Sequence, residues 1–485
     1  MYMDDKEGQV HIFFLPFMAH GHMIPTIDMA KLFASQGVKA TIVTTPVNAP
    51  LVSKSIQRSK NLGFEINIKT IKFPAVEVGL PEGCENADSI TSHEMQGEMT
   101  KRFFMATSML QEPLEKLLQE CHPNCLIADM FLPWTTDAAA KFGIPRLVFH
   151  GISCFSLCTS DCLRRYEPYK KVSSDSELFV VPELPGDIKF TRQQLPDFMK
   201  QNVETDFTRL IQKVRESSWK SYGIVINSFY ELESAYADFF KELGRKAWHI
   251  GPVSLCNREF EDKAQRGKEA SIDEQECLKW LDSKKPNSVV YICFGTVANF
   301  SDSQLKEIAL ALEASGQQFI WVVRKYKKAK DEEEWLPEGF EKRMESKGLI
   351  IRGWAPQVVI LDHEAIGGFM THCGWNSTIE GIAAGKPMVT WPVSAEQFFN
   401  EKLVTEVLKI GVAVGVQQWV TVYGDSIKSE AIEKAVTRIM IGEEAEEMRR
   451  RVKALGGMAK RAIEEDGSAY SDLKALIEEL RGRRH

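Results

Sequence analysis

The chain has 485 residues, of which 44% are hydrophobic and 26% charged, a balance typical of a folded globular protein. Its formal net charge of −7 argues against a general nucleic-acid binder, because binding to a phosphate backbone requires clustered lysine and arginine. A chain of this length exceeds one ordinary hydrophobic core, so we expect two domains and a small-molecule partner.

The N-terminal residues 1–7 are acidic and polar, without the basic and apolar regions of a signal peptide. No apolar run approaches the roughly 18 residues of a membrane span. We therefore expect a cytoplasmic protein without stable membrane insertion. The ten cysteines are scattered, and Cys154, Cys158 and Cys162 have helical spacing. In a reducing compartment we expect buried, unpaired thiols, in preference to disulfides or metal ligands.

The first half of the chain alternates strand-like and helix-like segments. An apolar strand at 10–15 is followed by a loop at 16–23, a helix at 25–35 and a β-branched strand at 38–45. The alternation continues with a strand at 65–71, a helix at 101–119, a strand at 125–129, a helix at 135–142 and a strand at 147–150. This pattern predicts an α/β domain with a parallel, doubly wound sheet.

A second series follows residues 257–275, which are charged, almost devoid of large apolar side chains, and typical of a linker. It begins with a strand at 288–294, a Gly295-Thr296 turn, and a helix from Ser301 or Asp302 to Ala314, capped by Gly316. Further strands are expected at 319–323, 349–351, 368–370 and 388–391, with a solvated charged loop at 325–334.

In open α/β sheets ligands bind beyond the carboxyl ends of the strands. The loops after the strands that end at Leu15, Asp129, Phe294 and Met370 should therefore share one cleft. They supply His20, His22, Asp129, Thr296 and His372. Polar side chains that converge in this way indicate an enzyme.

The segment from Trp354 to Gln397 carries the most specific pattern. After a buried strand, either Asn376 or Ser377 can cap a helix, with Glu380 three residues after Ser377 as in a capping box. Such a helix start binds phosphate through its backbone N–H groups and dipole, and His372 can add a donor. An ordinary capped helix is the alternative interpretation of this segment alone.

The whole segment, with Trp354, Gln357, His-Cys-Gly-Trp-Asn-Ser at 372–377, Glu380 and Gln397 in place, resembles the signature box of plant secondary-product glycosyltransferases. These family 1 enzymes use UDP-sugars and have the GT-B fold, two Rossmann-like doubly wound α/β domains that face each other across a cleft. The resemblance implies an acceptor-binding domain at 1–250, a linker at 251–278, a UDP-sugar-binding domain at 279–460, and a C-terminal helix at 461–485 that packs back on the first domain.

The resemblance also implies the roles of the donor-site residues. Trp354 would stack on uracil, Gln357 and Glu380 would bind the ribose, and Trp375, Glu396 and Gln397 would face the sugar. His372, Asn376 and Ser377 would hold the diphosphate, and Thr296 and Ala355 complete the implied site. A terminal Gln, together with Trp at position 375, usually accompanies UDP-glucose in this family. The carboxylates of Glu380 and Glu396 and the amide of Gln397 are also suited to accept hydrogen bonds from sugar hydroxyls.

The acceptor needs a general base, and histidine suits this role near neutral pH. A histidine in a loop is otherwise a surface or capping residue, but the Gly-His-Met-Ile-Pro segment resembles the family's N-terminal motif and implies that His22 is the base. The role of His20 stays open. Asp129 matches the aspartate that orients the base, following the logic of a catalytic triad. An aspartate at a strand end can also be a simple cap.

The implied mechanism is a single displacement with inversion, which gives a β-glucoside. No Asp-x-Asp sequence is present, so we expect neither a metal nor a cofactor, with UDP-glucose as co-substrate. A metal site formed by His20, His22 and His372 is the disfavoured alternative, because nothing in the sequence orders these ligands.

The acceptor is expected to be a hydrophobic plant compound, namely a flavonoid, triterpenoid or steroid with a hydroxyl or carboxyl group. Variable segments at 80–94, 150–163 and 190–206 would line its pocket, and Phe155, Leu157 and Leu195 there suit a hydrophobic aglycone or an ordinary core. Another UDP-sugar or an already glycosylated acceptor is an alternative, as is a non-catalytic sugar-nucleotide binding protein. A nucleotide-dependent oxidoreductase is disfavoured because neither βα turn has G-x-G-x-x-G. We expect a monomer without nucleic-acid partners.

Overall fold

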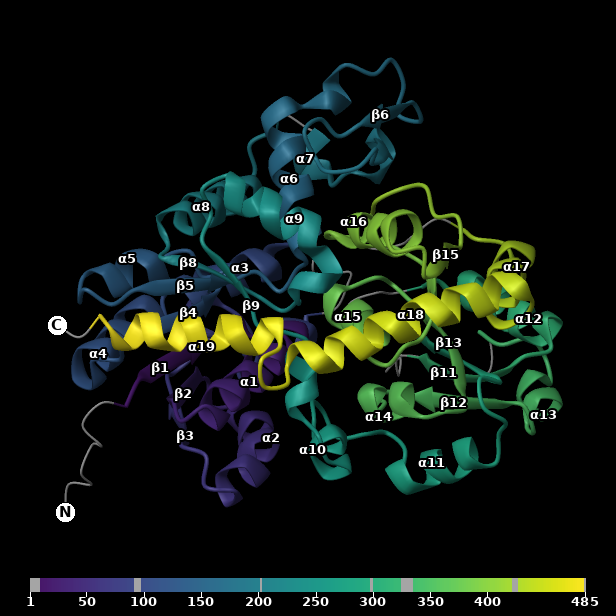
Figure 1. Cartoon of the computed structure of the whole chain (residues 1–485), viewed down its shortest axis with the longest axis horizontal. Coiled ribbons are helices and arrows are strands. Elements are labelled where there is room, and N and C mark those ends of the chain that lie inside the picture. Colours follow the sequence, from purple (N-terminus) through teal and green to yellow (C-terminus); the bar gives the residue numbers. More distant parts are fainter. Residues whose placement is uncertain are drawn as a thin grey trace. The chain divides into compact units, whose positions relative to one another are not determined.

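The computed structural model of the chain describes residues 9–90, 97–200, 203–296, 300–323, 335–420 and 426–483. The chain divides into two compact units. Unit 1 comprises residues 1–152, 203–267 and 461–485, and unit 2 comprises residues 153–202 and 268–460. Figure 1 labels helices and strands of both units where there is room. The solvated loop expected at 325–334 lies outside the described residues, as do parts of the segments at 80–94 and 190–206.

Unit 1 contains a seven-stranded parallel sheet with the order β3-β2-β1-β4-β5-β8-β9. The strands are β1 (His11–Leu15), β2 (Lys39–Thr44), β3 (Ile66–Thr70), β4 (Cys125–Asp129), β5 (Arg146–Phe149), β8 (Gly223–Ile226) and β9 (Ala247–His249). The central strands are buried along their whole length because helices cover both faces of a parallel sheet. The five strands expected in this half are all present.

The described helices of unit 1 are α1 (His20–Ser35), α2 (Ala49–Asn61), α3 (Glu98–Ser108), α4 (Gln111–Cys121), α5 (Thr135–Ala140), α8 (Asp206–Lys220), α9 (Tyr230–Glu242), α10 (Phe260–Ala264) and α19 (Ser468–Arg481). Residues 461–485 belong to this unit, and α19 buries Leu473, Leu476 and Leu480 in its core. That apolar face recurs every three or four residues, as expected for a helix that packs on a sheet.

Two helices of unit 1 differ from the expected ones. Helix α1 begins at His20, one turn before Pro25, so His20 and His22 lie in a helix and not in a loop. A proline is tolerated near the start of a helix, and Pro25 lies in the second turn of α1. The expected helix at 101–119 is two helices that meet at Met109 and Leu110. Pro113 explains the break, because it cannot donate to the carbonyl of Met109.

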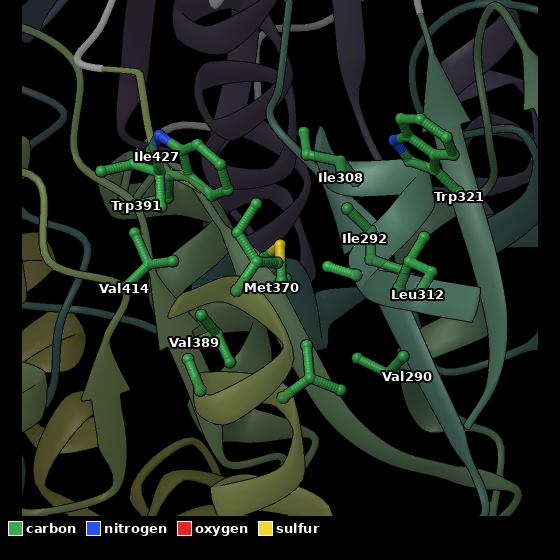
Figure 2. Close-up of a cluster of buried hydrophobic side chains, with 14 of the residues drawn as sticks. Val290, Ile292, Ile308, Leu312, Trp321, Met370, Val389, Trp391, Val414 and Ile427 are labelled. Carbon is green, nitrogen blue, oxygen red and sulfur yellow. The ribbon is translucent and has the colours of Figure 1, made fainter. Parts of the chain in front are cut away.

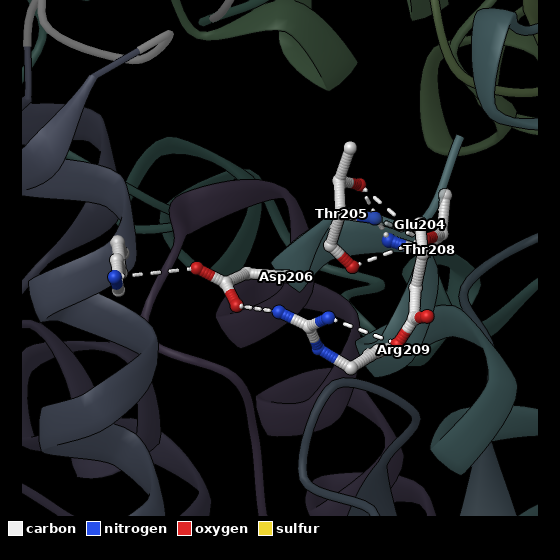
Figure 3. A network of polar contacts seen from close by, with 6 residues as sticks. Glu204, Thr205, Asp206, Thr208 and Arg209 are labelled. Atoms are coloured by element: carbon white, nitrogen blue, oxygen red, sulfur yellow. Dashed lines mark hydrogen bonds and ion pairs between the residues drawn. The ribbon is translucent and has the colours of Figure 1, made fainter.

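The N-terminus of α8 shows how a polar segment starts a helix (Figure 3). The hydroxyl of Thr205 accepts a hydrogen bond from the N–H of Thr208 at 3.1 Å, and the Thr208 hydroxyl accepts from the N–H of Thr205 at 2.8 Å. Asp206 pairs with Arg209 in the same helix and with Lys101 of α3 at 3.4 Å. A carboxylate in the first turn of a helix also interacts favourably with the helix dipole.

Unit 2 contains a six-stranded parallel sheet with the order β12-β11-β10-β13-β14-β15 and a two-stranded antiparallel hairpin. The sheet is formed by β10 (Val289–Cys293), β11 (Gln318–Val323), β12 (Gly348–Arg352), β13 (Ile366–Thr371), β14 (Met388–Thr390) and β15 (Gly411–Ala413), and the hairpin by β6 (Leu178–Val180) and β7 (Lys189–Thr191). The strands expected in the second series are confirmed to within a few residues.

The described helices of unit 2 are α6 (Cys154–Tyr166), α7 (Asp197–Lys200), α11 (Glu274–Asp282), α12 (Asp302–Ser315), α13 (Phe340–Met344), α14 (Gln357–Asp362), α15 (Trp375–Ala383), α16 (Gln397–Lys402), α17 (Ser429–Met440) and α18 (Glu443–Ala462). Ser301 caps α12 by accepting from the N–H of Gln304, and Gly316 ends it in a left-handed conformation, as expected. Apolar side chains of α12 pack on alternate residues of the sheet (Figure 2).

Residues 153–202 group with unit 2, whereas the sequence placed them in the N-terminal domain at 1–250. Their contacts explain this grouping. The hydroxyl of Ser156 in α6 donates to the side-chain carbonyl of Asn400 in α16 at 3.0 Å. The ring of Phe190 packs edge-on against Phe399 with centroids 5.3 Å apart. Hydrophobic pattern alone cannot reveal such long-range partners.

The expected linker is also more ordered than its composition suggested. It contains α10, and Asn257 is buried, where its side-chain N–H donates to Asp28 of α1 at 2.8 Å. Arg266 donates to the other oxygen of the same carboxylate at 2.6 Å. Polar residues can thus anchor a segment that has few apolar side chains, because buried polar and charged groups form hydrogen bonds with one another.

Cys154, Cys158 and Cys162 lie along α6 and are buried, as their helical spacing predicted. Among the helices of the described residues, none combines the length and the apolarity that would be needed to span a bilayer. Phe155 and Leu195 are fully buried, so they belong to the packing of unit 2.

Candidate functional site

The strand order of unit 1 reverses direction between β1 and β4, which lie side by side. Side chains beyond the carboxyl ends of the strands at such a switch point are placed to bind ligands. His22 is the third residue of the helix that follows β1, and Asp129 is the last residue of β4. The Nδ1 atom of His22 lies 2.7 Å from Oδ2 of Asp129.

This hydrogen bond determines the tautomer of His22. An ionised carboxylate can only accept, so Nδ1 carries the proton and Nε2 is the basic nitrogen. The other oxygen of Asp129 accepts the N–H of Phe131 at 2.9 Å. The Asp129 side chain is completely buried, whereas that of His22 is 25% exposed. The pair therefore has the geometry of a general base with its orienting carboxylate.

Aromatic rings surround His22. The centroid of Phe17 lies 5.5 Å from that of His22, and the centroid of Phe131 lies 5.6 Å from it. Phe104 of α3 stacks on Phe17 at 5.7 Å and contacts Phe131 at 5.9 Å. Rings in such offset and edge-on arrangements stabilise one another and offer flat apolar surfaces to an aromatic ligand. The sequence analysis missed these three residues, although Phe131 follows Asp129 by only two positions.

A buried arginine holds the main chain at Asp129. Arg146 opens β5 and is 3% exposed, and its Nη2 donates to the main-chain carbonyl of Asp129 at 2.9 Å. Burial lowers the pKa of Arg146 to about 9, while the Asp129 carboxylate acts in the opposite direction. The sequence analysis missed this residue, and an arginine that opens a buried strand was its only signal.

His20 has a different partner from that of His22. Its Nδ1 forms a hydrogen bond with Oδ2 of Asp88, which also accepts the N–H of His20 at 3.2 Å. Asp88 thereby holds the short helix at Ala87–Ser89 against the start of α1. Within the described part of the chain, no group of three His, Cys, Asp or Glu side chains could hold a metal ion.

The sheet of unit 2 has its switch point between β10 and β13. His372 directly follows β13, and Thr296 lies in the turn after β10. The imidazole of His372 fits between two glycines. A Cβ on Gly295 would lie 2.7 Å from Cε1 of the ring, and one on Gly374 would lie 2.5 Å from Nε2. Only residues without side chains can flank the ring so closely.

The electrostatic state of His372 follows from its burial. Burial lowers its pKa to about 4, so the ring is neutral at pH 7. Its Nδ1 is buried and has no hydrogen-bond partner among the described residues. Buried polar atoms are rarely left without a partner, and such an atom at a switch point suits a ligand that supplies one. A diphosphate oxygen would accept from a ring N–H.

The helix after His372 begins earlier than expected. Gly374 is the N-cap of α15 and has no side chain to form a capping bond, so neither Asn376 nor Ser377 is the cap. Trp375, Asn376 and Ser377 instead form the first turn, where the positive end of the helix dipole lies. Cys373 reaches this start with a φ of 65°, a strained conformation for a residue other than glycine. The helix end that we expect to bind phosphate is therefore present, with Gly374 and Trp375 at its start.

Gln357 and Glu380 form a polar pair beside this helix start. Nε2 of Gln357 donates to the Glu380 carboxylate at 2.7 Å and to the Ser377 hydroxyl at 3.2 Å. Trp354 and Ala355 lie between β12 and α14, where Trp354 is partly exposed and Ala355 is 7% exposed. The structure thus brings the expected ribose-binding and diphosphate-binding residues together at one edge of the sheet.

Glu396 and Gln397 lie at the start of α16, beyond the end of β14. The Gln397 carbonyl already accepts the N–H groups of Val393 at 2.8 Å and Ser394 at 2.9 Å. It therefore cannot serve as the acceptor expected for sugar hydroxyls, and the side-chain NH2 group of Gln397 can only donate.

Asn400, which the sequence analysis missed, lies one turn later and donates to Glu396 at 3.1 Å and to the Cys373 carbonyl at 2.8 Å. Trp375 is 2% exposed.

The chain is similar to known proteins. A sequence model of the family described as "UDP-glucoronosyl and UDP-glucosyl transferase" matches residues 111–448. The chain is 63% identical to a scopoletin glucosyltransferase of Nicotiana tabacum over 98% of both chains. It is 58% identical to the UDP-glucose flavonoid 3-O-glucosyltransferase 7 of Fragaria ananassa, over 99% of this chain and 98% of that one.

A solved structure is similar over the whole chain. It is UGT73P12 of Glycyrrhiza uralensis, complexed with glycyrrhetinic acid 3-O-monoglucuronide. The TM-score is 0.91 and the sequence identity is 42%, and the match covers 98% of this chain and 96% of that one.

Proposed function

The chain belongs to the plant family 1 UDP-glycosyltransferases, which have the GT-B fold, and on that premise we propose that it transfers glucose from UDP-glucose to a hydroxyl group of a flat phenolic compound. The observation that carries this proposal is the His22–Asp129 pair surrounded by Phe17, Phe104 and Phe131. Because the chain belongs to a family of glycosyltransferases, we no longer consider the oxidoreductase and the non-catalytic alternatives.

The proposed reaction is a single displacement. Nε2 of His22 takes the proton of the acceptor hydroxyl, and the oxygen attacks the anomeric carbon of glucose. The bond from that carbon to the β-phosphate oxygen breaks, UDP leaves, and the configuration at the carbon inverts to give a β-glucoside. Asp129 stabilises the imidazolium that forms, while Arg146 supports the main chain at Asp129.

We further propose that the departing diphosphate is stabilised without a metal. The N-terminus of α15 would supply backbone donors and its positive dipole end, and His372 a neutral ring N–H. Turnover should then be the same in excess EDTA as in added magnesium. A loss of activity in EDTA that magnesium restores would reject this part of the proposal.

The aromatic surroundings of His22 support a phenolic acceptor over a bulky polycyclic aliphatic one. A planar ring can stack on Phe104 or Phe131 while it presents its hydroxyl to Nε2. The scopoletin and flavonoid glucosyltransferases, both more than half identical to this chain, act by name on such compounds. Phenolic hydroxyls are also more acidic than aliphatic ones, which eases their deprotonation by an imidazole.

An already glycosylated acceptor is the second candidate. The similar structure from Glycyrrhiza uralensis is complexed with a monoglucuronide, which supports a glycosylated acceptor for this chain as well. On this alternative, activity should be higher on a monoglycoside than on its aglycone.

Mass spectrometry of the products tests the proposal directly. The enzyme is incubated with UDP-glucose, UDP-galactose or UDP-glucuronate and with scopoletin, a flavonol, a triterpenoid or a monoglycoside of each. We expect monoglucosides of the two phenolics from UDP-glucose, with a β configuration by NMR. Products confined to the triterpenoid, or an α-glycoside, would reject the proposal.

A further inference from the structure

The segment that enters unit 2 is tied to Trp354. Ser271 follows the charged stretch Arg266-Gly267-Lys268-Glu269, which has no large apolar side chain to anchor it. The N–H of Ser271 donates to the carbonyl of Trp354 at 2.8 Å, and the N–H of Trp354 donates to the Ser271 hydroxyl at 2.9 Å. The two residues are 83 positions apart, and both belong to unit 2. This reciprocal pair fixes both peptide groups of Trp354.

Gly353 makes room for this pair. Its φ of 132° is a conformation that residues with side chains rarely adopt, and a Cβ there would lie 2.1 Å from the Ser271 hydroxyl. The Gly353 N–H also donates to the carbonyl of Val323 at the end of β11, at 2.8 Å. The main chain before Trp354 is therefore held by the sheet on one side and covered by Ser271 on the other.

Trp354 has little other regular structure to orient it. It lies between the end of β12 at Arg352 and the start of α14 at Gln357. The orientation of its side chain depends on the main chain, because a rotation about φ or ψ turns the whole residue. Stacking requires the faces of two rings to be parallel, so a fixed main chain lowers the entropy lost on binding.

We propose that Ser271 is a positioning residue for the donor site, which holds the indole of Trp354 ready to stack on the uracil of UDP-glucose. This inference rests on the proposed function, in which Trp354 is the stacking residue. Ser271 itself need not touch the nucleotide. The Ser271 hydroxyl accepts the main-chain N–H of Trp354. Neither Ser271 nor Trp354 has another side-chain group that could accept this hydrogen bond.

The binding of UDP, measured by calorimetry, tests the inference on the full-length enzyme. Ser271→Ala keeps the N–H of residue 271 but removes the acceptor, and we expect UDP to bind about three- to tenfold more weakly. Ser271→Thr keeps a hydroxyl on Cβ and should bind as the wild type does. Ser283→Ala is the matched control, because Ser283 is an exposed serine of unit 2 that donates to the Trp280 carbonyl at 2.6 Å. It should not change UDP binding.

A double variant distinguishes positioning from an independent contact. Trp354→Ala should weaken UDP binding by about ten- to a hundredfold through the loss of stacking. Adding Ser271→Ala to it should have no further effect, because the indole to be positioned is gone. In steady-state assays, Ser271→Ala should raise the KM for UDP-glucose and leave the KM for scopoletin unchanged, which a general loss of folding would not do.

The possible failures are separable. If Trp354→Ala binds UDP normally, the proposed donor site is wrong. If Trp354→Ala loses binding but Ser271→Ala binds as the wild type does, the donor site stands and the role of Ser271 is overturned. Additive losses in the double variant would also overturn it, as would a Ser271→Thr enzyme as weak as Ser271→Ala.

Discussion

Nδ1 of His22 and Oδ2 of Asp129 lie 2.7 Å apart, although 107 residues separate them along the chain. Strands β1 and β4 are neighbours in the sheet, so the helix after one and the end of the other meet at the switch point. The same arrangement recurs in unit 2, where β10 and β13 bring Thr296 and His372 to the corresponding place. Each unit thus places its proposed site residues where its strand order reverses.

The first prediction concerns this pair. His22→Ala should lower turnover by at least about a hundredfold, because the acceptor loses its base. Asp129→Asn should also lower turnover strongly, since an amide does not stabilise the imidazolium. Calorimetry should show that both variants bind UDP normally, as His22 and Asp129 lie in unit 1. Near-normal turnover in His22→Ala would remove this residue from the mechanism.

The second prediction concerns the acceptor. Phe104→Leu removes a stacking face while keeping an apolar side chain, so the KM for scopoletin should rise several-fold, within the roughly 0.5–1.5 kcal/mol of an aromatic pair. The KM for UDP-glucose should stay the same. Phe319→Leu, in the core of unit 2, is a control for the general effect of losing a phenylalanine. An unchanged KM for scopoletin in Phe104→Leu would argue against an aromatic acceptor subsite.

The third prediction concerns the glycine that packs against the His372 ring. The backbone of Gly374 has a φ of −58°, which alanine adopts readily, so Gly374→Ala adds only a methyl group. That methyl would lie 2.5 Å from Nε2 of His372 and should displace the ring. UDP affinity should fall as much as in His372→Ala, and the two changes together should be no worse than either alone. Additive losses would mean that Gly374 acts independently of His372.

The fourth prediction concerns acid stability. Burial lowers the pKa of His150, His249 and His372 from 6.5 to about 4. Above pH 6.5 each ring is neutral in both the folded and the unfolded chain, and stability is full. As the pH falls from 6.5 towards 4, the unfolded chain binds protons that the folded chain excludes, so stability is lost. A shift of this size corresponds to about 3 kcal/mol for each histidine.

Thermal unfolding midpoints at pH 7.5 and pH 5 measure this loss. His249 is not part of the proposed site, so His249→Gln should make the difference between the two midpoints smaller without affecting UDP binding. An identical difference in the wild type and in His249→Gln would show that this histidine does not cause the acid sensitivity.

Much of this fold follows from local pattern. The apolar runs that became β1, β4, β10 and β13 are short and bounded by turn residues, and burial on both faces leaves little ambiguity about such segments. Helix starts were less predictable. Gly374 begins α15 although it offers no side-chain cap, because the tight turn at Cys373 and the packing of Trp375 decide where the helix starts.

Some site residues could be identified from the sequence and others could not. His22, Asp129 and the residues between Trp354 and Gln397 were identified because they form motifs that are contiguous in the sequence. Arg146, Asn400 and Ser271 were not identified, since each acts through a hydrogen bond to a residue outside its own motif, 17, 244 and 83 positions away. An arginine, asparagine or serine has many ordinary surface roles, and only the folded chain shows which partner it has.

The grouping of residues 153–202 with unit 2 has a consequence for recombination between relatives. A chimera joined at a single crossover near residue 250 would combine Ser156 and Phe190 of one parent with Asn400 and Phe399 of the other. Hybrids that instead inherit 153–202 together with 268–460 keep every one of these partners. Shuffling for new specificity should therefore exchange the two segments of unit 2 together, with crossovers at 152/153, 202/203, 267/268 and 460/461.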